Sequence, residues 1–267
     1  MEIKNRIFFV TGGCSGLGLA VMEELLALRG LVCVFDRDKE QGRALQKKHD
    51  SRVLFQAADV RSELEIHSGI KKALETWPER TIGGLVHCAG VGAADKTVSS
   101  SGQAGSLEIF KSVIDINLTG SFNVARLVAT EIAKQKLSIE KSKTDQKAKH
   151  DEGVIILTSS TSYQDGQVGQ VGYAASKGGV ASMVLPMARD LARFGIRVNA
   201  IAPSLFDTQM GKSISPAVKS NLLKTVEYPL RFGDPGEFSS LVMECIRNTY
   251  LNGTVIRLDA AGRMGKI

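Results

Sequence analysis

Short, continuous apolar segments alternate with helix-like segments along the whole chain, and this alternation limits the possible folds more than any other feature. The apolar segments have the length of strands but lack the every-second-residue pattern of a strand with one face in water. Such strands are typical of a parallel sheet that helices cover on both faces. Strands are predicted at 6–12, 31–36, 52–59, 83–90, 153–160, 196–203 and 254–261.

Helical periodicity fills the intervals between these strands. The chain of 267 residues is therefore predicted to form one α/β domain, 1–267, with a Rossmann-type, doubly wound, parallel seven-stranded sheet and helices on both faces. Helices are predicted at 17–28, 39–49, 62–77, 106–135, 172–194 and 235–248.

The positive net charge is concentrated in one segment. Residues 134–150 hold six lysines against Glu140 and Asp145, whereas the whole chain has a net charge of +6. We expect a solvated Lys-rich surface insertion around 134–152. A basic charge this local is weak evidence for nucleic-acid binding. The cysteines and histidines lack disulfide or metal-ligand spacing, so no metal site is expected.

The chain contains no apolar run long enough to span a bilayer, so no membrane association is expected. Its N-terminal residues lead almost directly into the first predicted strand, without the pattern of a signal or transit peptide. We expect a cytoplasmic protein, with mitochondria as the alternative.

A glycine-rich turn, TGGCSGLG at 11–18, follows the first strand and opens the first helix. Glycines there allow a tight turn and a close approach of the backbone to a pyrophosphate, which the helix N-terminus attracts. The second strand ends at Asp36, whose carboxylate could bind ribose hydroxyls and repel a 2′-phosphate, which favours NAD over NADP. Arg37 argues against this preference, because an arginine can pair with a phosphate. A glycine pattern alone is also compatible with a turn that binds nothing.

Two other strand ends offer further cofactor contacts. Asp59 and Val60 close the third strand and could fix an adenine, although a simple turn aspartate is an equally good interpretation. The small residues Cys88, Ala89 and Gly90 end the fourth strand and would let a cofactor pass.

The stretch YAASK places Tyr173 and Lys177 on one face of a predicted helix. Ser160 ends the fifth strand, and the carboxyl ends of parallel strands are where doubly wound folds bind ligands. An ammonium lowers the pKa of a neighbouring phenol. The phenolate could remove the hydroxyl proton of an alcohol while hydride leaves for nicotinamide, with Ser160 bonded to the same substrate oxygen.

The motifs described so far, together with one asparagine, make the chain resemble the short-chain dehydrogenase/reductase family over essentially its whole length. The resemblance rests on TGGCSGLG, Asp36, Asp59, Asn117, Ser160 and YAASK. The resemblance implies a catalytic tetrad in which Asn117 holds a helix bulge and a relay water beside Ser160, Tyr173 and Lys177. It also implies that Thr208 contacts the nicotinamide carboxamide. The expected NAD contacts are Gly12, Ser15, Gly16, Leu17, Gly18, Asp36, Asp59, Val60, Cys88, Ala89, Gly90, Tyr173, Lys177, Pro203 and Thr208.

The stretches GQVGQVGYAASKGG and RFGDPGEF are similar to the members of this family that oxidise 3-hydroxyacyl-CoA. This implies a small-molecule substrate of that class, held by Ser160, Gln167 and Tyr173 beneath a lid around 204–232. It also implies a homotetramer paired through 106–135 and 172–194. One alternative is another alcohol, such as a hydroxysteroid. The other is a nucleic-acid or partner-binding protein that retains the fold. The family's usual Asn-Asn-Ala-Gly is replaced here by His87, Cys88, Ala89 and Gly90.

Overall fold

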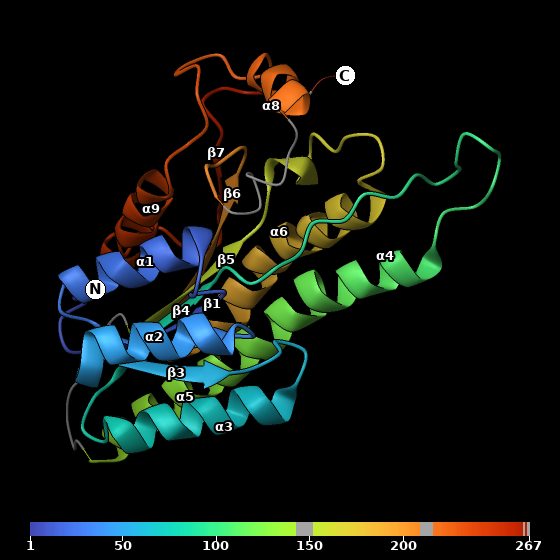
Figure 1. Ribbon diagram of the computed structural model, residues 1–267. Coiled ribbons are helices and arrows are strands. Elements are labelled where there is room, and N and C mark those ends of the chain that lie inside the picture. Colours follow the sequence, from blue (N-terminus) through green and yellow to red (C-terminus); the bar gives the residue numbers. More distant parts are fainter. Residues whose placement is uncertain (143–151, 209–215, 264, 266–267) are drawn as a thin grey trace.

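The computed structural model describes residues 1–142, 152–208, 216–263 and 265, and a single sheet forms the centre of these residues (Figure 1). The sheet has seven strands in the order β3-β2-β1-β4-β5-β6-β7, and all neighbours pair in parallel. The strands are β1 Ile7–Thr11, β2 Leu31–Asp36, β3 Val53–Ala57, β4 Ile82–His87, β5 Gly153–Thr158, β6 Ile196–Pro203 and β7 Val255–Leu258.

The predicted doubly wound parallel sheet is confirmed, and each predicted strand overlaps an observed one. The reason is the continuous apolar character of the strands. β1, β4, β5 and β6 are buried along their whole length, which requires cover on both faces of the sheet.

Helices supply that cover in two layers (Figure 1). One apolar core lies between the sheet and α1 and α9, and a second lies between the sheet and α3, α5 and α6. Each helix in the described part of the chain is too short or too polar to span a bilayer. The helices are α1 Gly16–Ala27, α2 Lys39–His49, α3 Glu63–Thr76, α4 Leu107–Ile114, α5 Gly120–Ser142, α6 Val171–Leu191, α8 Pro216–Leu223 and α9 Pro235–Arg247.

The helix predicted at 106–135 is interrupted by a π-helical turn, Asp115–Thr119, which is the helix bulge that the family resemblance implies at Asn117. The predicted end of this helix is wrong, because α5 continues to Ser142. The π turn accommodates Asn117, whose fully buried side chain bonds the backbone of Val91. The beginning of the expected Lys-rich insertion is therefore helical, and 143–151 lie outside the described residues.

A buried arginine fixes β6, the strand that leads to the predicted site residues Pro203 and Thr208. Arg197 is 6% exposed, and its guanidinium donates to backbone carbonyls at and beyond the C-terminal end of α9. The distances are 2.7 Å to Cys245, 2.8 Å to Ile246, 3.2 Å to Asn248 and 2.9 Å to Leu251. These bonds satisfy carbonyls that a helix end leaves without intrahelical donors.

We expect Arg197→Met to lower the free energy of unfolding by roughly 2–4 kcal/mol, because buried carbonyls lose charged donors. Arg43→Met, at an exposed position of α2, is the matched control and should change stability by less than about 0.5 kcal/mol. Urea denaturation followed by circular dichroism measures both. Equal stabilities for the two variants would contradict the assigned role of Arg197.

Candidate active site

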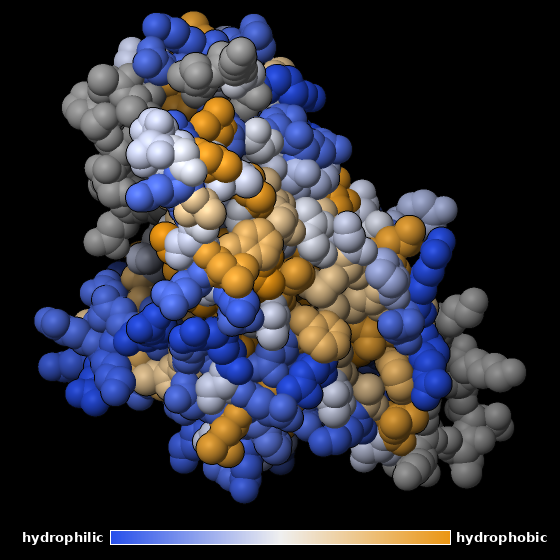
Figure 2. All heavy atoms as spheres, turned by 90° about the vertical axis from the view of Figure 1, so that its right-hand side faces the viewer, coloured by the Kyte–Doolittle hydropathy of each residue, from blue (hydrophilic) through white to orange (hydrophobic). Residues whose placement is uncertain are grey.

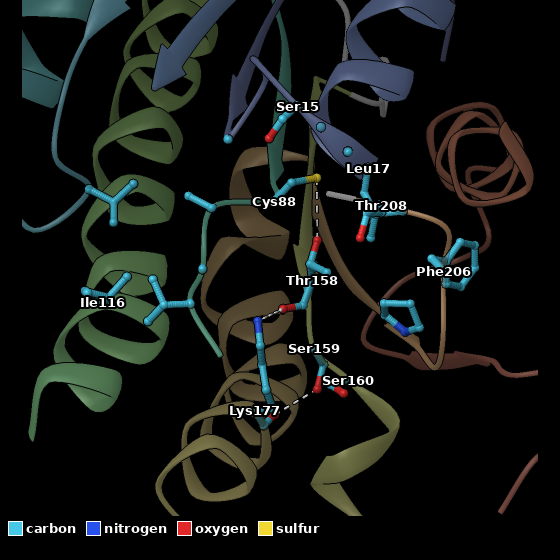
Figure 3. Close-up of a pocket in the computed structure, with 18 of the residues that line it drawn as sticks. Ser15, Leu17, Cys88, Ile116, Thr158, Ser159, Ser160, Lys177, Phe206 and Thr208 are labelled. Carbon is cyan, nitrogen blue, oxygen red and sulfur yellow. Dashed lines mark hydrogen bonds between the residues drawn. The ribbon is translucent and has the colours of Figure 1, made fainter. Parts of the chain in front are cut away.

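A cavity of about 410 Å³ opens at the carboxyl ends of the strands, where β1 and β4 lie side by side (Figure 3). It is lined by every residue that the sequence predicts to contact NAD, together with Ser160. Asn117 and Gln167 do not line it. The structure thus brings together residues that are far apart in the sequence, from the first glycine turn to Thr208.

The glycine-rich turn has the geometry that its sequence predicts. Gly12 and Gly16 adopt positive φ angles of 64° and 53°. A Cβ on Gly18 would lie 2.2 Å from the carbonyl oxygen of Gly12, so only glycine allows α1 to pack this closely on the turn. Ser15 is the N-cap residue of α1 but makes no side-chain cap hydrogen bond, and it faces the cavity (Figure 3).

Asp36 lies at the end of β2, beside this turn. Its carboxylate accepts hydrogen bonds from the backbone N–H of Cys14 at 3.0 Å and of Asp38 at 3.1 Å. Asp36 and Arg37 both line the cavity. The two backbone bonds hold the carboxylate at the place where the sequence predicts a ribose.

The Asp59 carboxylate is hydrogen-bonded to a residue of its own turn. Its carboxylate accepts from the Arg61 guanidinium, at 2.6 Å for the Nη2–Oδ2 pair. These bonds lower the pKa of Asp59 to about 2. Its backbone N–H donates to Glu65 Oε2 at 2.7 Å. Asp59 lines the cavity with a carboxylate that Arg61 already engages, so an adenine contact through that carboxylate stays a prediction.

Thr11 and His87 join the ends of β1 and β4. The Thr11 hydroxyl accepts from the backbone N–H groups of Cys88 and Ala89, both at 3.1 Å, and lies 2.9 Å from His87 Nδ1. Burial lowers the pKa of His87 to about 3, so the ring is neutral at pH 7. Thr11 Oγ1 and His87 Nδ1 share a hydrogen bond whose direction follows from the tautomer of the neutral imidazole. A histidine at this position thus holds the two strand ends together through Thr11.

Lys177 is a buried cation at the centre of the site. It is 5% exposed, and its Nζ donates to the backbone carbonyl of Thr158 at 2.8 Å (Figure 3). The Ser159 hydroxyl donates to the Lys177 carbonyl at 2.8 Å, which ties α6 to the end of β5. Burial lowers the pKa of Lys177 to about 8.

Tyr173 lies close to Lys177 on α6. The Lys177 Nζ is 5.8 Å from the centre of the tyrosine ring. The sequence predicts a pKa lowered by the ammonium, and in this structure that prediction is wrong. Burial raises the pKa of Tyr173 above its ordinary value, and only a hydrogen bond with Ser160 acts in the opposite direction.

Ser160 is held by the short 3₁₀ turn that follows it. Its Oγ accepts from the Ser162 hydroxyl at 2.9 Å and from the Ser162 backbone N–H at 3.3 Å. The Ser160 proton is then free to be donated toward Tyr173 or a substrate oxygen. Ser160, Tyr173 and Lys177 thus lie together on the wall of the cavity.

Asn117 and Gln167 lie outside the cavity wall. The Asn117 amide bonds the Val91 carbonyl at 2.9 Å and the Ser176 hydroxyl at 3.1 Å, so it fixes the chain just after Gly90. The buried Nε2 of Gln167 makes no hydrogen bond within the described residues. The roles predicted for both side chains stay predictions.

Sequence reasoning missed several residues of the site. Thr158 acts through its backbone carbonyl, which no residue type can signal. Thr11 belongs to the glycine motif, whose pattern gives it no role, although its hydroxyl accepts hydrogen bonds from the backbone after β4. The predicted lid around 204–232 contains Leu205, Phe206 and Phe232, which form part of the apolar wall, but the sequence does not single them out, and it gives no indication of Ile116.

Comparisons with known proteins agree with this geometry. The family model described as short chain dehydrogenase matches residues 6–219. The chain is 43% identical to 3-hydroxyacyl-CoA dehydrogenase type-2 of Homo sapiens, over 98% of this chain and 97% of the relative. It is 33% identical to ipsdienol dehydrogenase of Ips pini, over 98% of this chain and 99% of the relative. A crystal structure of 3-hydroxyacyl-CoA dehydrogenase type-2 from Mycobacterium avium superimposes with a TM-score of 0.89 at 32% identity, and covers 98% of both chains.

Lys177 should make the stability of the protein depend on pH. Between its pKa of about 8 in the folded state and its ordinary value of 10.5, the unfolded chain binds a proton that the folded chain does not. The free energy of unfolding should therefore rise with pH across this window. We expect wild type to gain stability relative to Lys177→Met by roughly 1 kcal/mol per pH unit there.

Urea denaturation at several pH values within the window measures this difference. Lys47→Met, at an exposed position of α2, is the matched control. A difference between wild type and Lys177→Met that stays constant with pH would contradict the burial of an ammonium at this site.

Proposed function

The chain belongs to the short chain dehydrogenase family, and we propose that it transfers hydride between the secondary hydroxyl of a 3-hydroxyacyl-CoA and NAD. The observation that carries this proposal is the placement of Ser160, Tyr173 and Lys177 on one cavity with the glycine-rich turn and Asp36. The cavity can therefore hold a dinucleotide along the strand ends, with an alcohol beside the tyrosine.

In the proposed reaction Tyr173 is the general base for alcohol oxidation. Its phenolate takes the hydroxyl proton of the substrate, while Ser160 donates a hydrogen bond to the same oxygen. NAD, when bound, supplies the positively charged nicotinamide that accepts the hydride. Because burial raises the pKa of Tyr173 in the protein without cofactor, the phenolate would depend on the hydrogen bond from Ser160 and on the positive charge that the nicotinamide adds when NAD is bound. Asn117 would keep the π turn and the chain after Gly90 in place behind Lys177.

The preference for NAD rests on Asp36. Its carboxylate is held by two backbone N–H groups at the edge of the cavity, where a ribose 2′-hydroxyl can donate to it and a 2′-phosphate is repelled. The glycine turn and the N-terminus of α1 would hold the pyrophosphate. Thr208, which also lines the cavity, would contact the nicotinamide carboxamide.

The substrate class rests on the similarity to 3-hydroxyacyl-CoA dehydrogenase type-2 and on the apolar wall. Phe206 and Phe232 line the cavity and suit an acyl chain. Gln167 follows Ser160 on the same loop, and its buried Nε2 could donate to a substrate. We propose that the segment 204–232, of which 209–215 lie outside the described residues, closes over this substrate. Other secondary alcohols are the second candidate, because ipsdienol dehydrogenase is also a relative.

Assembly and location are further proposals. Apolar side chains gather in a band across the face shown in Figure 2, the side on which α4 lies. A second copy of the chain that covers α4, α5 and α6 would support the expected homotetramer. The exposed apolar residues of α4, α5 and α6 include Leu107, Phe110, Phe122, Val171 and Leu185.

The location of the protein is a separate proposal. We keep the cytoplasm as the proposed location and mitochondria as the alternative.

The proposal predicts that Tyr173→Phe loses turnover and keeps cofactor binding. With NAD and a short-chain 3-hydroxyacyl-CoA, the rate of NADH formation should fall by at least about 100-fold, because the general base is lost. Tyr250→Phe, at a 98% exposed position outside the cavity wall, is the matched control and should retain most of the wild-type rate. NADH absorbance measures turnover, and NADH fluorescence measures binding.

Three results would count against parts of this proposal. Turnover by Tyr173→Phe close to wild type would remove the tyrosine from the mechanism. NADH binding without turnover of 3-hydroxyacyl-CoA by wild type would reject the substrate class, and a panel of other secondary alcohols would then identify the correct one. If the wild-type protein neither bound NADH nor oxidised any substrate, the proposed reaction would be wrong.

Cofactor preference gives a separate prediction. We expect Asp36→Ala to raise the ratio of kcat/KM with NADP to that with NAD by about 10-fold or more, because one unfavourable charge contact is removed while Arg37 remains. Asp38→Asn is the control, since it keeps the hydrogen bond that caps α2 and lies outside the cavity wall. An unchanged ratio in Asp36→Ala would show that another group determines the preference.

A further inference from the structure

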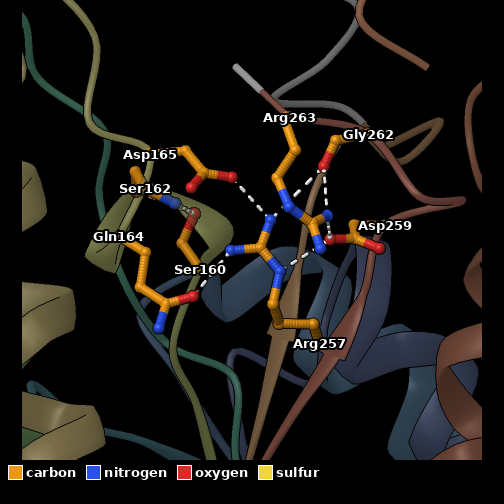
Figure 4. A network of polar contacts seen from close by, with 8 residues as sticks. All are labelled: Ser160, Ser162, Gln164, Asp165, Arg257, Asp259, Gly262 and Arg263. Carbon is orange, nitrogen blue, oxygen red and sulfur yellow. Dashed lines mark hydrogen bonds and ion pairs between the residues drawn. The ribbon is translucent and has the colours of Figure 1, made fainter. Parts of the chain in front are cut away.

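Two arginines and two aspartates form a network that joins the end of β7 to the turn after Ser160 (Figure 4). The Arg257 guanidinium contacts Asp165 Oδ2 at 2.5 Å, Gln164 Oε1 at 2.9 Å and Asp259 Oδ2 at 2.7 Å. Arg263 contacts only the C-terminal part of this network, with Asp259 Oδ2 at 2.9 Å and the Gly262 carbonyl at 2.7 Å.

Most side chains of the network are shielded from water, and this strengthens the ion pairs between them. The side chains of Arg257, Asp165 and Asp259 are 17%, 16% and 11% exposed, whereas that of Arg263 is 63% exposed. A planar guanidinium that bonds several acceptors at once holds them in a fixed geometry. An exposed pair contributes little by comparison. Arg257 is therefore the member of the network that can fix the position of another segment.

The segment that Arg257 fixes leads back to Ser160 in two steps. The backbone N–H groups of Gln164 and Asp165 both donate to the Thr161 carbonyl, at 3.1 Å and 2.9 Å, and so close the turn. Within that turn, the Ser162 hydroxyl and backbone N–H donate to Ser160 Oγ. The orientation of the Ser160 hydroxyl therefore depends on a turn whose far end is held by an arginine on β7.

We propose that Arg257 is a positioning residue that fixes the turn 161–165 and thereby directs the Ser160 hydroxyl toward Tyr173 and the substrate oxygen. The inference rests on the proposed function for its effect on the rate, but not for its effect on the turn. Ser160 donates the hydrogen bond that lowers the pKa of Tyr173, so a misplaced Ser160 should leave less of the tyrosine as phenolate at a given pH and should also weaken the contact with the substrate.

The experiment compares Arg257→Met, Asp165→Asn and the control Arg263→Gln. Backbone amide hydrogen exchange is measured first, because it requires no substrate. We expect faster exchange of the amides at 161–165 in Arg257→Met and Asp165→Asn, and exchange close to wild type in Arg263→Gln. Unchanged exchange in Arg257→Met would overturn the inference, whatever reaction the protein catalyses.

Kinetics then separate positioning from a general loss of stability. We expect kcat of Arg257→Met to fall by about 10-fold to 100-fold, with an unchanged dissociation constant for NADH. Its pH profile for alcohol oxidation should move upward by about half a pKa unit, since a hydrogen bond to the phenolate is weakened. Asp165→Asn should add little to the loss in an Arg257→Met background, because the two side chains act through one contact.

The outcomes that contradict the inference differ from those that contradict the proposed function. A loss of kcat that only follows the fraction of folded protein, with an unmoved pH profile, would reduce Arg257 to a structural role. If kcat fell equally in Arg257→Met and in Arg263→Gln, the inference that Arg257 positions the turn and the exposed Arg263 does not would be wrong. A wild type without turnover would reject the proposed function, while hydrogen exchange still decides whether Arg257 holds the turn.

Discussion

The placement of β1 between β2 and β4 is the constraint on which the site depends. All strands are parallel, and the connections that follow β1 and β4 run to opposite faces of the sheet. A crevice therefore lies between the carboxyl ends of these two strands. This single topological feature gathers residues at the ends of β1, β2, β4 and β5, namely the glycine turn, Asp36, the Cys88–Gly90 segment and Ser160. Thr11 then fixes the crevice, since its hydroxyl bonds the backbone after β4.

The proposed function places Lys177 inside the crevice, whereas the burial of its ammonium there costs stability. Burial disfavours its ammonium and lowers its pKa to about 8, and the Thr158 carbonyl offsets part of that cost through a 2.8 Å hydrogen bond. The same burial raises the pKa of Tyr173. The proposed chemistry therefore depends on groups that the protein keeps poorly solvated. The Ser159 hydroxyl bonds the Lys177 carbonyl and the Ser162 hydroxyl bonds Ser160, so these contacts come from residues that take no part in the proposed proton transfer.

The sequence predicts those parts of the structure that local patterns determine. The strands follow from continuous apolar runs, and the turn follows from Gly12, Gly16 and Gly18, where any side chain would strain or block the backbone. The interruption at Asp115–Thr119 could not be read from periodicity, because it depends on Asn117 meeting Val91 from a distant loop. The pKa of Tyr173 was predicted in the wrong direction, since spacing reveals the lysine but not the burial. The hold of Arg257 on the turn after Ser160 links residues about 90 positions apart, and no local pattern indicates it.

The central claim is that this cavity transfers hydride directly from an alcohol carbon to a nicotinamide, with Tyr173 moving the proton. The most direct test uses a 3-hydroxyacyl-CoA that carries deuterium on its carbinol carbon, with mass spectrometry of the NADH formed in one turnover. The account predicts that the deuterium appears in the nicotinamide ring and that Tyr173→Phe abolishes the transfer. Deuterium that is lost to water, or retained in the substrate while NADH is formed, would contradict it.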